Sequence, residues 1–420
     1  MSKKLKVLCW SDSVIAQTGY GVTSKYILRA LHDTGLYEID QLAINYNGDF
    51  YDRHAYPYHL VPAKVLNPND PHGIEMFKRT MLQKPYDIVW IMNDTYVVHK
   101  ISDFLGSVRQ AYLSKGIIPP LFIYYYPVDC HVPTNFSGMI RKADVAVTYT
   151  EYGREETIKV IPEIKDKLKV IGLGVNTSSI KPLTTNEKMA HRKTYFSTED
   201  NEKFIICNVN RNSVRKQMPV TLLAFSEFRK TVPNSMLYLH TNAQDQGINL
   251  LAACEDLGLV VGEDVLFPAN YSPLRGFPEE ILNRIYNCAD VFLSTHLGEG
   301  YGLSIPEGLA AGLPVVVPNN TNMPEFPEVF MYPCDDFVWV DNSGYRKCGR
   351  IEDIVGALNT VYELRGTSGL AERSERAIGW CKKNDWAEVG RRWVSLFRQA
   401  YTAHVASSHK DMVDIPQEII

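Results

Sequence analysis

Residues 291–318 read VFLSTHLGEGYGLSIPEGLAAGLPVVVP, and this stretch decides the fold that we expect for the chain. The apolar run Val291–Leu293 predicts a short buried strand, and a second apolar run, Val315–Val317, predicts another. Between them, a turn with three glycines leads into a helix predicted to begin at Ser304 and to end at Gly312. Strand, glycine-rich turn, helix and strand form a βαβ unit, whose turn lies where open α/β sheets bind ligands. Free backbone N–H groups at the start of the helix favour an anion such as phosphate.

Two glutamates stand at this predicted anion site. Glu299 lies in the turn, and Glu307 lies near the start of the helix. A carboxylate beside a phosphate is unfavourable unless hydroxyl groups, such as those of a sugar, donate hydrogen bonds to it. Two structural interpretations remain open: Glu299 as a solvated loop residue, and Glu307 as the acid of a capping box with Ser304.

The string EGYGLSIPEGLAAGLPVV, residues 299–316, resembles the donor-site signature of glycosyltransferase family 4. Members of that family are retaining enzymes of the GT-B fold that use nucleotide sugars. The resemblance implies that Glu299 faces the transferred sugar and that Glu307 holds the nucleotide ribose. It also implies that the loop between them contacts the donor through Gly300, Tyr301, Gly302 and Leu303.

The resemblance assigns further donor-binding residues in the second half of the chain. Arg211 and Lys216 match the arginine and lysine with which the family holds the diphosphate, and their charges suit that task. Gln217 replaces the glycine that is usual after this lysine, so a differently shaped loop is expected there. Asn270 and Tyr271 match positions that contact the nucleotide base.

In the first half, Gly19 and Gly21 stand at a predicted strand-to-helix junction. A nicotinamide site is disfavoured here, because Ser24 occupies the place of the third glycine and no acid follows at the expected distance. The resemblance instead makes Gly19 and Gly21 part of a glycine-rich loop that faces the donor. Asp129 and His131 follow the predicted strand Leu121–Tyr126, where a family histidine or acid approaches the donor sugar. The spacing does not choose between these two residues.

Residues 45–62 are polar and dense in aromatic side chains. GT-B enzymes usually bind the acceptor on the first domain, so we expect Tyr51 and Tyr56 to stack on the acceptor. The alternative is a surface loop held by Pro57 and Pro62.

Composition excludes several classes of protein. The chain has 420 residues, of which 45% are hydrophobic and 22% charged, with a formal net charge of −4. That charge gives no general reason to expect nucleic acid, although residues 1–172 carry 20 Lys and Arg against 18 Asp and Glu. The eight cysteines are scattered without a metal-binding spacing, and we expect no metal and no cofactor. No signal peptide and no apolar segment of about 18 residues is present, so a cytoplasmic location is expected.

The sequence thus predicts an α/β protein of the GT-B fold, with two Rossmann-like domains facing across a cleft and a C-terminal helix that crosses back to the first domain. The predicted acceptor domain spans residues 1–176 with about 395–420, and the predicted donor domain spans residues 177–394. The expected function is retaining transfer of a sugar, a hexose or pentose, from a nucleotide sugar such as a UDP-sugar to a soluble sugar or small hydroxylated molecule. The alternatives are transfer to hydroxymethylated bases of viral DNA and a non-catalytic subunit that binds nucleotide sugars. The sequence does not identify the sugar, the base, the acceptor or the oligomeric state.

Overall fold

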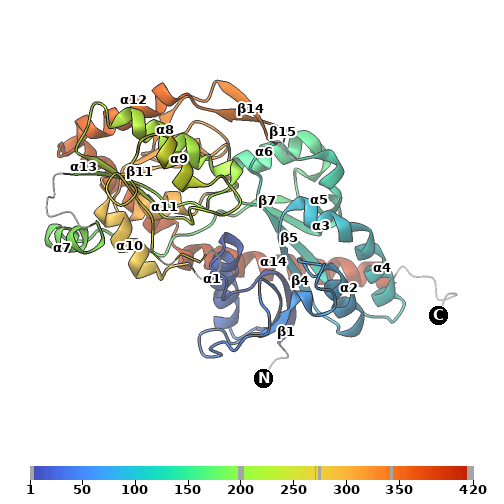
Figure 1. The fold of residues 1–420 in the computed structure, drawn as a ribbon. Helices are drawn as coiled ribbons and strands as arrows, with labels where there is room; N and C mark the ends of the chain where they lie inside the picture. The colour runs from blue at the N-terminus through green and yellow to red at the C-terminus, as the bar shows by residue number, and fades with distance from the viewer. Residues whose placement is uncertain (1–3, 197–202, 270, 273–275, 341–343, 414–420) are drawn as a thin grey trace. The chain divides into compact units, whose positions relative to one another are not determined.

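The structure, a computed structural model, describes residues 4–196, 203–269, 271–272, 276–340 and 344–413, with side chains described as far as Ser408. The chain forms two compact units (Figure 1): unit 1 comprises Met1–Leu173 and Trp386–Ile420, and unit 2 comprises Gly174–Asp385. The domain boundaries expected from the sequence, 176/177 and about 395, lie a few residues later in the chain than these observed boundaries, 173/174 and 385/386. The second boundary differs because helix α14 already begins at Trp386.

Unit 1 contains a seven-stranded parallel sheet with the order β3-β2-β1-β4-β5-β6-β7. In this order the chain changes direction across the sheet between β1 and β4, which creates a ligand-binding switch point at the carboxyl ends of those two strands. The strands are β1 (Leu5–Asp12), β2 (Tyr37–Ile44), β3 (His59–Pro62), β4 (Ile88–Met92), β5 (Leu121–Tyr126), β6 (Val145–Thr148) and β7 (Leu168–Val170).

Buried apolar residues line both faces of this sheet, as expected for a parallel sheet covered by helices. Alternate residues of β1, including Leu8 and Trp10, join a core with Phe77 and Met81 of α2. The helices of unit 1 are α1 (Gly19–Asp33), α2 (Ile74–Gln83), α3 (Thr95–Val98), α4 (Ser102–Leu113), α5 (Gly138–Lys142), α6 (Glu151–Val160) and α14 (Trp386–Val413).

Helix α14 returns to the first sheet after the whole of unit 2, and in Figure 1 this red helix lies beside the blue elements of unit 1. Trp393 is fully buried, with its ring 5.6 Å from that of Trp90 in β4 and 4.7 Å from that of Tyr125 in β5. Trp386 stacks on Tyr26 of α1 at 4.9 Å. Large aromatic rings buried in this way make α14 part of the core of unit 1.

Unit 2 contains a six-stranded parallel sheet with the order β10-β9-β8-β11-β12-β13. This order repeats that of the first six strands of unit 1, and its switch point lies between β8 and β11. The strands are β8 (Phe204–Asn208), β9 (Ser235–Leu239), β10 (Val265–Leu266), β11 (Val291–Leu293), β12 (Val315–Pro318) and β13 (Phe330–Tyr332).

The helices of unit 2 cover a second core, in which Phe225 and Phe228 of α8 pack against Ile354 and Leu358 of α12. The helices are α7 (Thr185–Phe196), α8 (Met218–Phe228), α9 (Leu250–Asp256), α10 (Glu279–Cys288), α11 (Ser304–Ala310), α12 (Ile351–Leu364) and α13 (Ser368–Lys383). The predicted α/β class is therefore confirmed in both units.

A two-stranded antiparallel hairpin, β14 (Asp336–Val340) with β15 (Gly344–Cys348), follows β13. Asp336 begins β14, and its carboxylate pairs with Arg350 at 2.8 Å. The exposed face of the hairpin carries Phe337, Trp339 and Tyr345.

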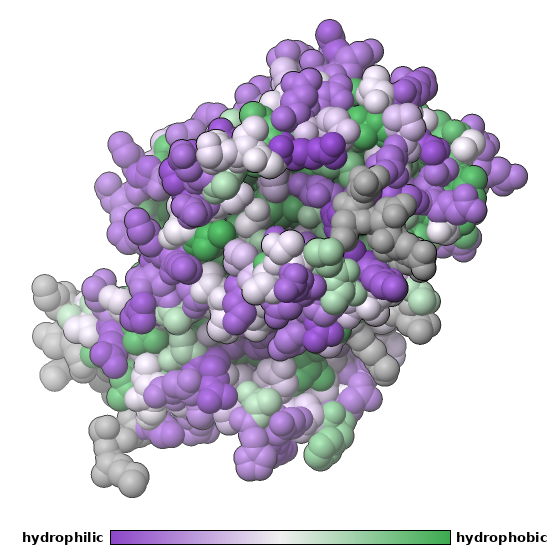
Figure 2. Space-filling model, turned by 90° about the vertical axis from the view of Figure 1, so that its left-hand side faces the viewer, coloured by the Kyte–Doolittle hydropathy of each residue, from purple (hydrophilic) through white to green (hydrophobic). Residues whose placement is uncertain are grey.

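The molecular face in Figure 2 is mostly hydrophilic, with hydrophobic residues in small separate groups. Within the described part of the chain, no helix combines the length and apolar character that crossing a membrane requires.

Candidate functional site

The switch point of unit 2 brings two loops together at the carboxyl edge of its sheet. The loop after β8 contains the 3₁₀ turn Val214–Lys216, and the loop after β11 contains Glu299. Because β8 and β11 pair directly, these loops are neighbours although they are far apart in the sequence. The backbone N–H of Leu297 donates to the carbonyl of Arg215 at 2.9 Å, which fixes one loop against the other.

Glu299 is the centre of a buried ionic cluster. Its carboxylate accepts a hydrogen bond from Lys216 Nζ and lies 3.0 Å from Arg215 Nη1, while only 6% of the residue is exposed. Lys216 Nζ also donates to Asn210 Oδ1 at 2.7 Å. Burial alone would raise the pKa of Glu299, but the charges of Arg215 and Lys216 outweigh it and hold the pKa well below its usual range. The carboxylate is therefore ionised at neutral pH.

The glycines around Glu299 give its loop a shape that other residues would not adopt. Gly298 and Gly302 have φ angles of 149° and 87°. A Cβ atom on Gly302 would also lie 3.3 Å from Glu299 Cγ, so it would press on that side chain. The loop thus holds Glu299 against the two cations.

The other residues predicted in this loop have mainly backbone roles. Gly300 is buried, and the carbonyl of Tyr301 accepts from Asn322 Nδ2 at 2.9 Å. The Tyr301 ring packs edge-on to Phe326 with centroids 5.4 Å apart. Leu303 occupies the N-cap position of α11.

Glu307 lies in the first turn of α11, and its carboxylate accepts a hydrogen bond of 2.7 Å from the hydroxyl of Tyr286 in α10. The capping box with Ser304 is not what the structure shows, because Leu303 is the N-cap residue and no side chain caps the helix there. Tyr286 therefore orients the Glu307 carboxylate, which does not cap the start of α11.

Arg211 pairs with an aspartate of the loop after β9. Its guanidinium forms a two-pronged ion pair with Asp245, at 2.6 and 3.0 Å. Arg215, which the sequence interpretation did not single out, occupies the place beside Glu299 instead. Its position next to Lys216 in a loop after a strand was the signal that could have identified it.

Gln217 adopts the left-handed conformation, with φ 52° and ψ 45°. That conformation explains why relatives in the resembled family have glycine at this position. The hydroxyl of Thr295 donates to the carbonyl of Gln217 at 2.9 Å and so supports the turn. Gln217 therefore adopts a backbone conformation that favours glycine, and a different loop shape stays a prediction.

An aromatic group lies near the predicted base-binding position. Tyr271 contacts His240 edge-on at 5.4 Å, and Phe277 contacts the same imidazole at 4.7 Å. His240 Nδ1 lies 2.8 Å from the hydroxyl of Tyr238, and burial lowers the pKa of His240 to about 4, so this imidazole is neutral at pH 7. Asn270 lies outside the described residues.

In unit 1, the loop after β1 packs tightly against the start of α1. Gly19 is the exposed first residue of α1, and Gly21 is buried. A Cβ atom on Gly21 would lie 2.0 Å from the carbonyl oxygen of Ala16, so only glycine fits. The Thr18 side chain caps the helix by accepting from Gly21 N at 3.0 Å.

Asp129 and His131 both lie in the loop after β5. His131 Nδ1 is 2.7 Å from the buried carboxylate of Glu156, and 84% of the His131 side chain is exposed. Asp129 is partly buried. Glu156 fixes one ring nitrogen of His131, which leaves the other ring nitrogen on the exposed side.

Tyr51 and Tyr56 lie in the loop before β3. The hydroxyl of Tyr51 donates to the carbonyl of Tyr58 at 2.7 Å, and its ring packs edge-on to Tyr46. Tyr56 is partly buried, and its N–H donates to Asp52 O at 2.9 Å. These contacts give Tyr51 a structural role in the loop, whatever else it binds.

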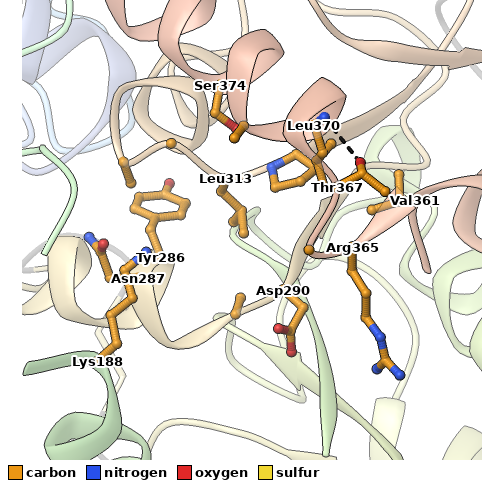
Figure 3. A pocket seen from close by; sticks show the side chains of 16 residues that line it. Lys188, Tyr286, Asn287, Asp290, Leu313, Val361, Arg365, Thr367, Leu370 and Ser374 are labelled. Carbon is orange, nitrogen blue, oxygen red and sulfur yellow. Dashed lines mark hydrogen bonds between the residues drawn. The ribbon is translucent and has the colours of Figure 1, made fainter. Parts of the chain in front are cut away.

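A separate pocket of about 350 Å³ lies at the opposite, amino edge of the sheet of unit 2 (Figure 3). Asp290, just before β11, and Leu313, just before β12, line it together with Thr367 and Leu370, whose hydrogen bond is drawn in Figure 3. Sheets of this type bind ligands at the carboxyl edge, so we place the candidate site at Glu299 and not in this pocket. Across the described residues, no three or more His, Cys, Asp and Glu side chains gather as a metal site would require.

Comparisons with known proteins show similarity in sequence and in fold. The model of a protein family described as glycosyl transferases group 1 matches residues 205–335, which include Arg215, Lys216 and Glu299. The chain is 25% identical over 288 residues to alpha-monoglucosyldiacylglycerol synthase of Acholeplasma laidlawii, covering 61% of this chain and 70% of that protein. It is 26% identical over 238 residues to an uncharacterized glycosyltransferase of Methanocaldococcus jannaschii, covering 54% of this chain and 58% of that protein.

Solved structures resemble the whole chain. HepE of Anabaena, crystallised with UDP and glucose, has a TM-score of 0.69 at 15% identity, covering 94% of this chain and 100% of that one. The catalytic domain of starch synthase IV from Arabidopsis thaliana, bound to ADP and acarbose, has a TM-score of 0.66 at 12% identity, covering 96% and 100%. At these identities the structural likeness establishes the fold alone, and the family model matches part of the second unit. The chain has the GT-B fold, and its residues 205–335 match the family model described as glycosyl transferases group 1.

Proposed function

We propose that this glycosyltransferase moves a sugar from a nucleoside diphosphate sugar, a UDP-sugar by first choice, to a hydroxyl group with retention of configuration. The observation that carries the proposal is the cluster of Glu299 with Lys216 and Arg215 at the switch point of unit 2. Two cations suit a diphosphate, and a carboxylate held ionised between them suits the hydroxyl groups of the sugar attached to it.

In the proposed reaction, the bond between the anomeric carbon and the diphosphate oxygen breaks, and the acceptor oxygen forms a bond on the same face. The acceptor proton passes to the departing phosphate oxygen, so no protein nucleophile is needed. Lys216 and Arg215 stabilise the negative charge that develops on the diphosphate, which is electrostatic catalysis. Helix α11 has only two turns, so we assign this role to the side chains rather than to its dipole.

The remaining residues take supporting roles in the proposal. Glu307, oriented by Tyr286, accepts hydrogen bonds from the ribose hydroxyls, and Tyr271 contacts the base. The loop backbone at Gly300–Leu303 contacts the donor. In unit 1, Gly19 and Gly21 line the donor side, and His131, held by Glu156, or Asp129 approaches the sugar. No metal takes part, so EDTA is expected to leave transfer unchanged, and restoration by magnesium after loss with EDTA would contradict this.

The acceptor that we propose first is a soluble sugar or small hydroxylated molecule. Transfer to a hydroxymethylated base in DNA is the alternative, and Tyr51 and Tyr56 suit either acceptor by stacking. Salt distinguishes the two, because transfer to DNA weakens steeply as salt rises and transfer to a neutral sugar does not. A non-catalytic subunit that only binds nucleotide sugars is the alternative of another class.

The experiment that tests the function is a hydrolysis screen without acceptor, using UDP-, ADP- and GDP-sugars, with calorimetric binding of UDP, ADP and NAD in parallel. Hydrolysis of one nucleotide sugar together with binding of its nucleotide is the expected result. Binding without any hydrolysis or transfer would favour the non-catalytic subunit. Binding of NAD alone would overturn the proposal.

A further inference from the structure

The sheet of unit 1 has its own switch point, between β1 and β4, and two carboxylates occupy it. Asp12 is the last residue of β1, and Asp94 follows β4 by two residues. The corresponding place in unit 2 holds the Lys216–Glu299 cluster, where we place the donor diphosphate. The two switch points therefore have the same topology, but the one in unit 1 presents carboxylates to whatever it binds.

Hydroxyl groups already satisfy part of each carboxylate. The Thr18 hydroxyl donates to Asp12, which is only 7% exposed. The Tyr20 hydroxyl donates to Asp94 Oδ1 at 2.8 Å. The Asn45 side chain also forms a hydrogen bond with the Asp12 carboxylate. Hydroxyl groups are thus partners that both carboxylates already accept, and a carboxylate accepts about four hydrogen bonds in all.

Tyr149, directly after β6, supplies an independent observation. The residue is 4% exposed, and its hydroxyl has no hydrogen-bond partner in the described structure. Burial, followed by the charges of Asp94 and Asp12, raises the pKa of Tyr149, so the hydroxyl stays protonated. A buried hydroxyl without a partner costs about 1–3 kcal/mol, and such groups in native proteins commonly await a ligand or water. Tyr149 therefore provides an unused donor and acceptor next to the two carboxylates.

We propose that Asp12, Asp94 and Tyr149 form a subsite for the hydroxyl groups of a neutral, polyhydroxylated acceptor of the sugar class. Calling this ligand the acceptor rests on the proposed function, whereas the binding of a sugar by these three residues does not depend on it. Carboxylates accept hydrogen bonds from sugar hydroxyls, and the Tyr149 hydroxyl both donates and accepts. The same carboxylates repel an acceptor that carries phosphate close to its reacting hydroxyl, as a sugar phosphate or DNA does. The subsite therefore selects the neutral acceptor over the nucleic acid.

Saturation-transfer NMR on the full-length chain tests the subsite directly, with glucose, maltose and glucose 6-phosphate as probes in the presence of UDP. We expect glucose or maltose to bind, and glucose 6-phosphate to bind at least about fivefold more weakly. Stronger binding of glucose 6-phosphate, or no binding of either neutral sugar, would overturn the proposal.

Two variants identify the site. Tyr149→Phe removes only the unpartnered hydroxyl and is expected to weaken binding of the neutral sugar about fivefold or more. Asp94→Asn removes a negative charge, so the affinities for glucose and for glucose 6-phosphate are expected to differ less than in the wild type. Tyr86→Phe is the matched control, because Tyr86 also donates to a carboxylate, Asp40, at 2.7 Å, but from the segment before β4.

The outcomes separate this inference from the proposed function. The subsite is excluded if Tyr149→Phe binds the neutral sugar as the wild type does and Asp94→Asn keeps the wild-type affinity ratio of glucose to glucose 6-phosphate. Thermal unfolding checks that both variants are folded. Failure of every nucleotide sugar to be hydrolysed would instead remove the proposed function, while the sugar-binding results would still report on Tyr149 and Asp94.

Discussion

The ammonium group of Lys216 donates a hydrogen bond to the carboxylate of Glu299, although the two residues are 83 positions apart in the sequence. Each residue belongs to the loop that follows one of two adjacent strands, β8 and β11. The pair therefore links the part of the site suited to phosphate with the part suited to sugar hydroxyls.

Glu299→Gln is expected to reduce transfer by about 100-fold or more, because an ionised group aimed at the reacting sugar is lost. UDP affinity should stay close to that of the wild type, since both cations remain. Single-turnover transfer and calorimetry measure the two effects. Equal losses of transfer and UDP affinity would show that Glu299 contacts the nucleotide rather than the sugar.

Lys216→Ala is expected to weaken UDP binding by about tenfold to a hundredfold, because a charged hydrogen bond contributes about 1.5–3 kcal/mol. Lys230→Ala is the matched control. Lys230 also pairs with a glutamate, Glu227, but this pair is exposed at the C-terminal end of α8. Calorimetric titration with UDP measures both variants. A Lys216→Ala protein with the dissociation constant of the wild type would exclude Lys216 from the diphosphate site.

Asp245→Asn tests whether Arg211 leaves its ion pair when the donor binds. If Arg211 moves to the diphosphate, Asp245 competes with the ligand, and its removal should tighten UDP binding by up to about fivefold. Arg211→Ala should weaken binding in the same assay. Weaker binding in both variants would mean instead that Asp245 holds Arg211 in its working position.

Acid should destabilise the wild-type protein more steeply than Glu299→Gln. The folded-state pKa of Glu299 lies below its usual value, so its contribution to stability is present above about pH 4.3 and is lost as the pH falls further. Thermal unfolding between about pH 7 and about pH 3 should therefore show the variant less stable at neutral pH and the two curves converging in acid. Parallel curves would show that the Glu299 ion pairs do not stabilise the fold.

The strands that matter for ligand binding could be predicted from apolar runs alone. Leu121–Tyr126 and Val291–Leu293 have the predicted ends, because prolines bound the first run and polar residues, Asp290 and Ser294, bound the second. The β14–β15 hairpin was missed, since its alternating residues begin with an acidic pair that is also typical of a turn.

Side-chain partners could not be predicted with the same success. Neighbouring cations Arg215 and Lys216 both contact Glu299 only because the 3₁₀ turn and the left-handed Gln217 aim them at one point. The ion pair of Arg211 with Asp245 depends on the position of the loop after β9, which no local sequence pattern predicts. Pairings of this kind are set by tertiary geometry, whereas the motif only supplies the residue types.

Helix α14 has a consequence for how the protein is made. Trp393 fills the core of unit 1 against Trp90 and Tyr125, yet it is synthesised after all of unit 2. While the ribosome translates unit 2, the first sheet has emerged with an apolar face that lacks its final helix. Unit 2 can complete its own fold first, since its residues are continuous in the chain. We therefore expect unit 1 to complete its core only after unit 2 has been translated, and a ribosome that stalls before Trp393 to leave that apolar face open to chaperones or proteases.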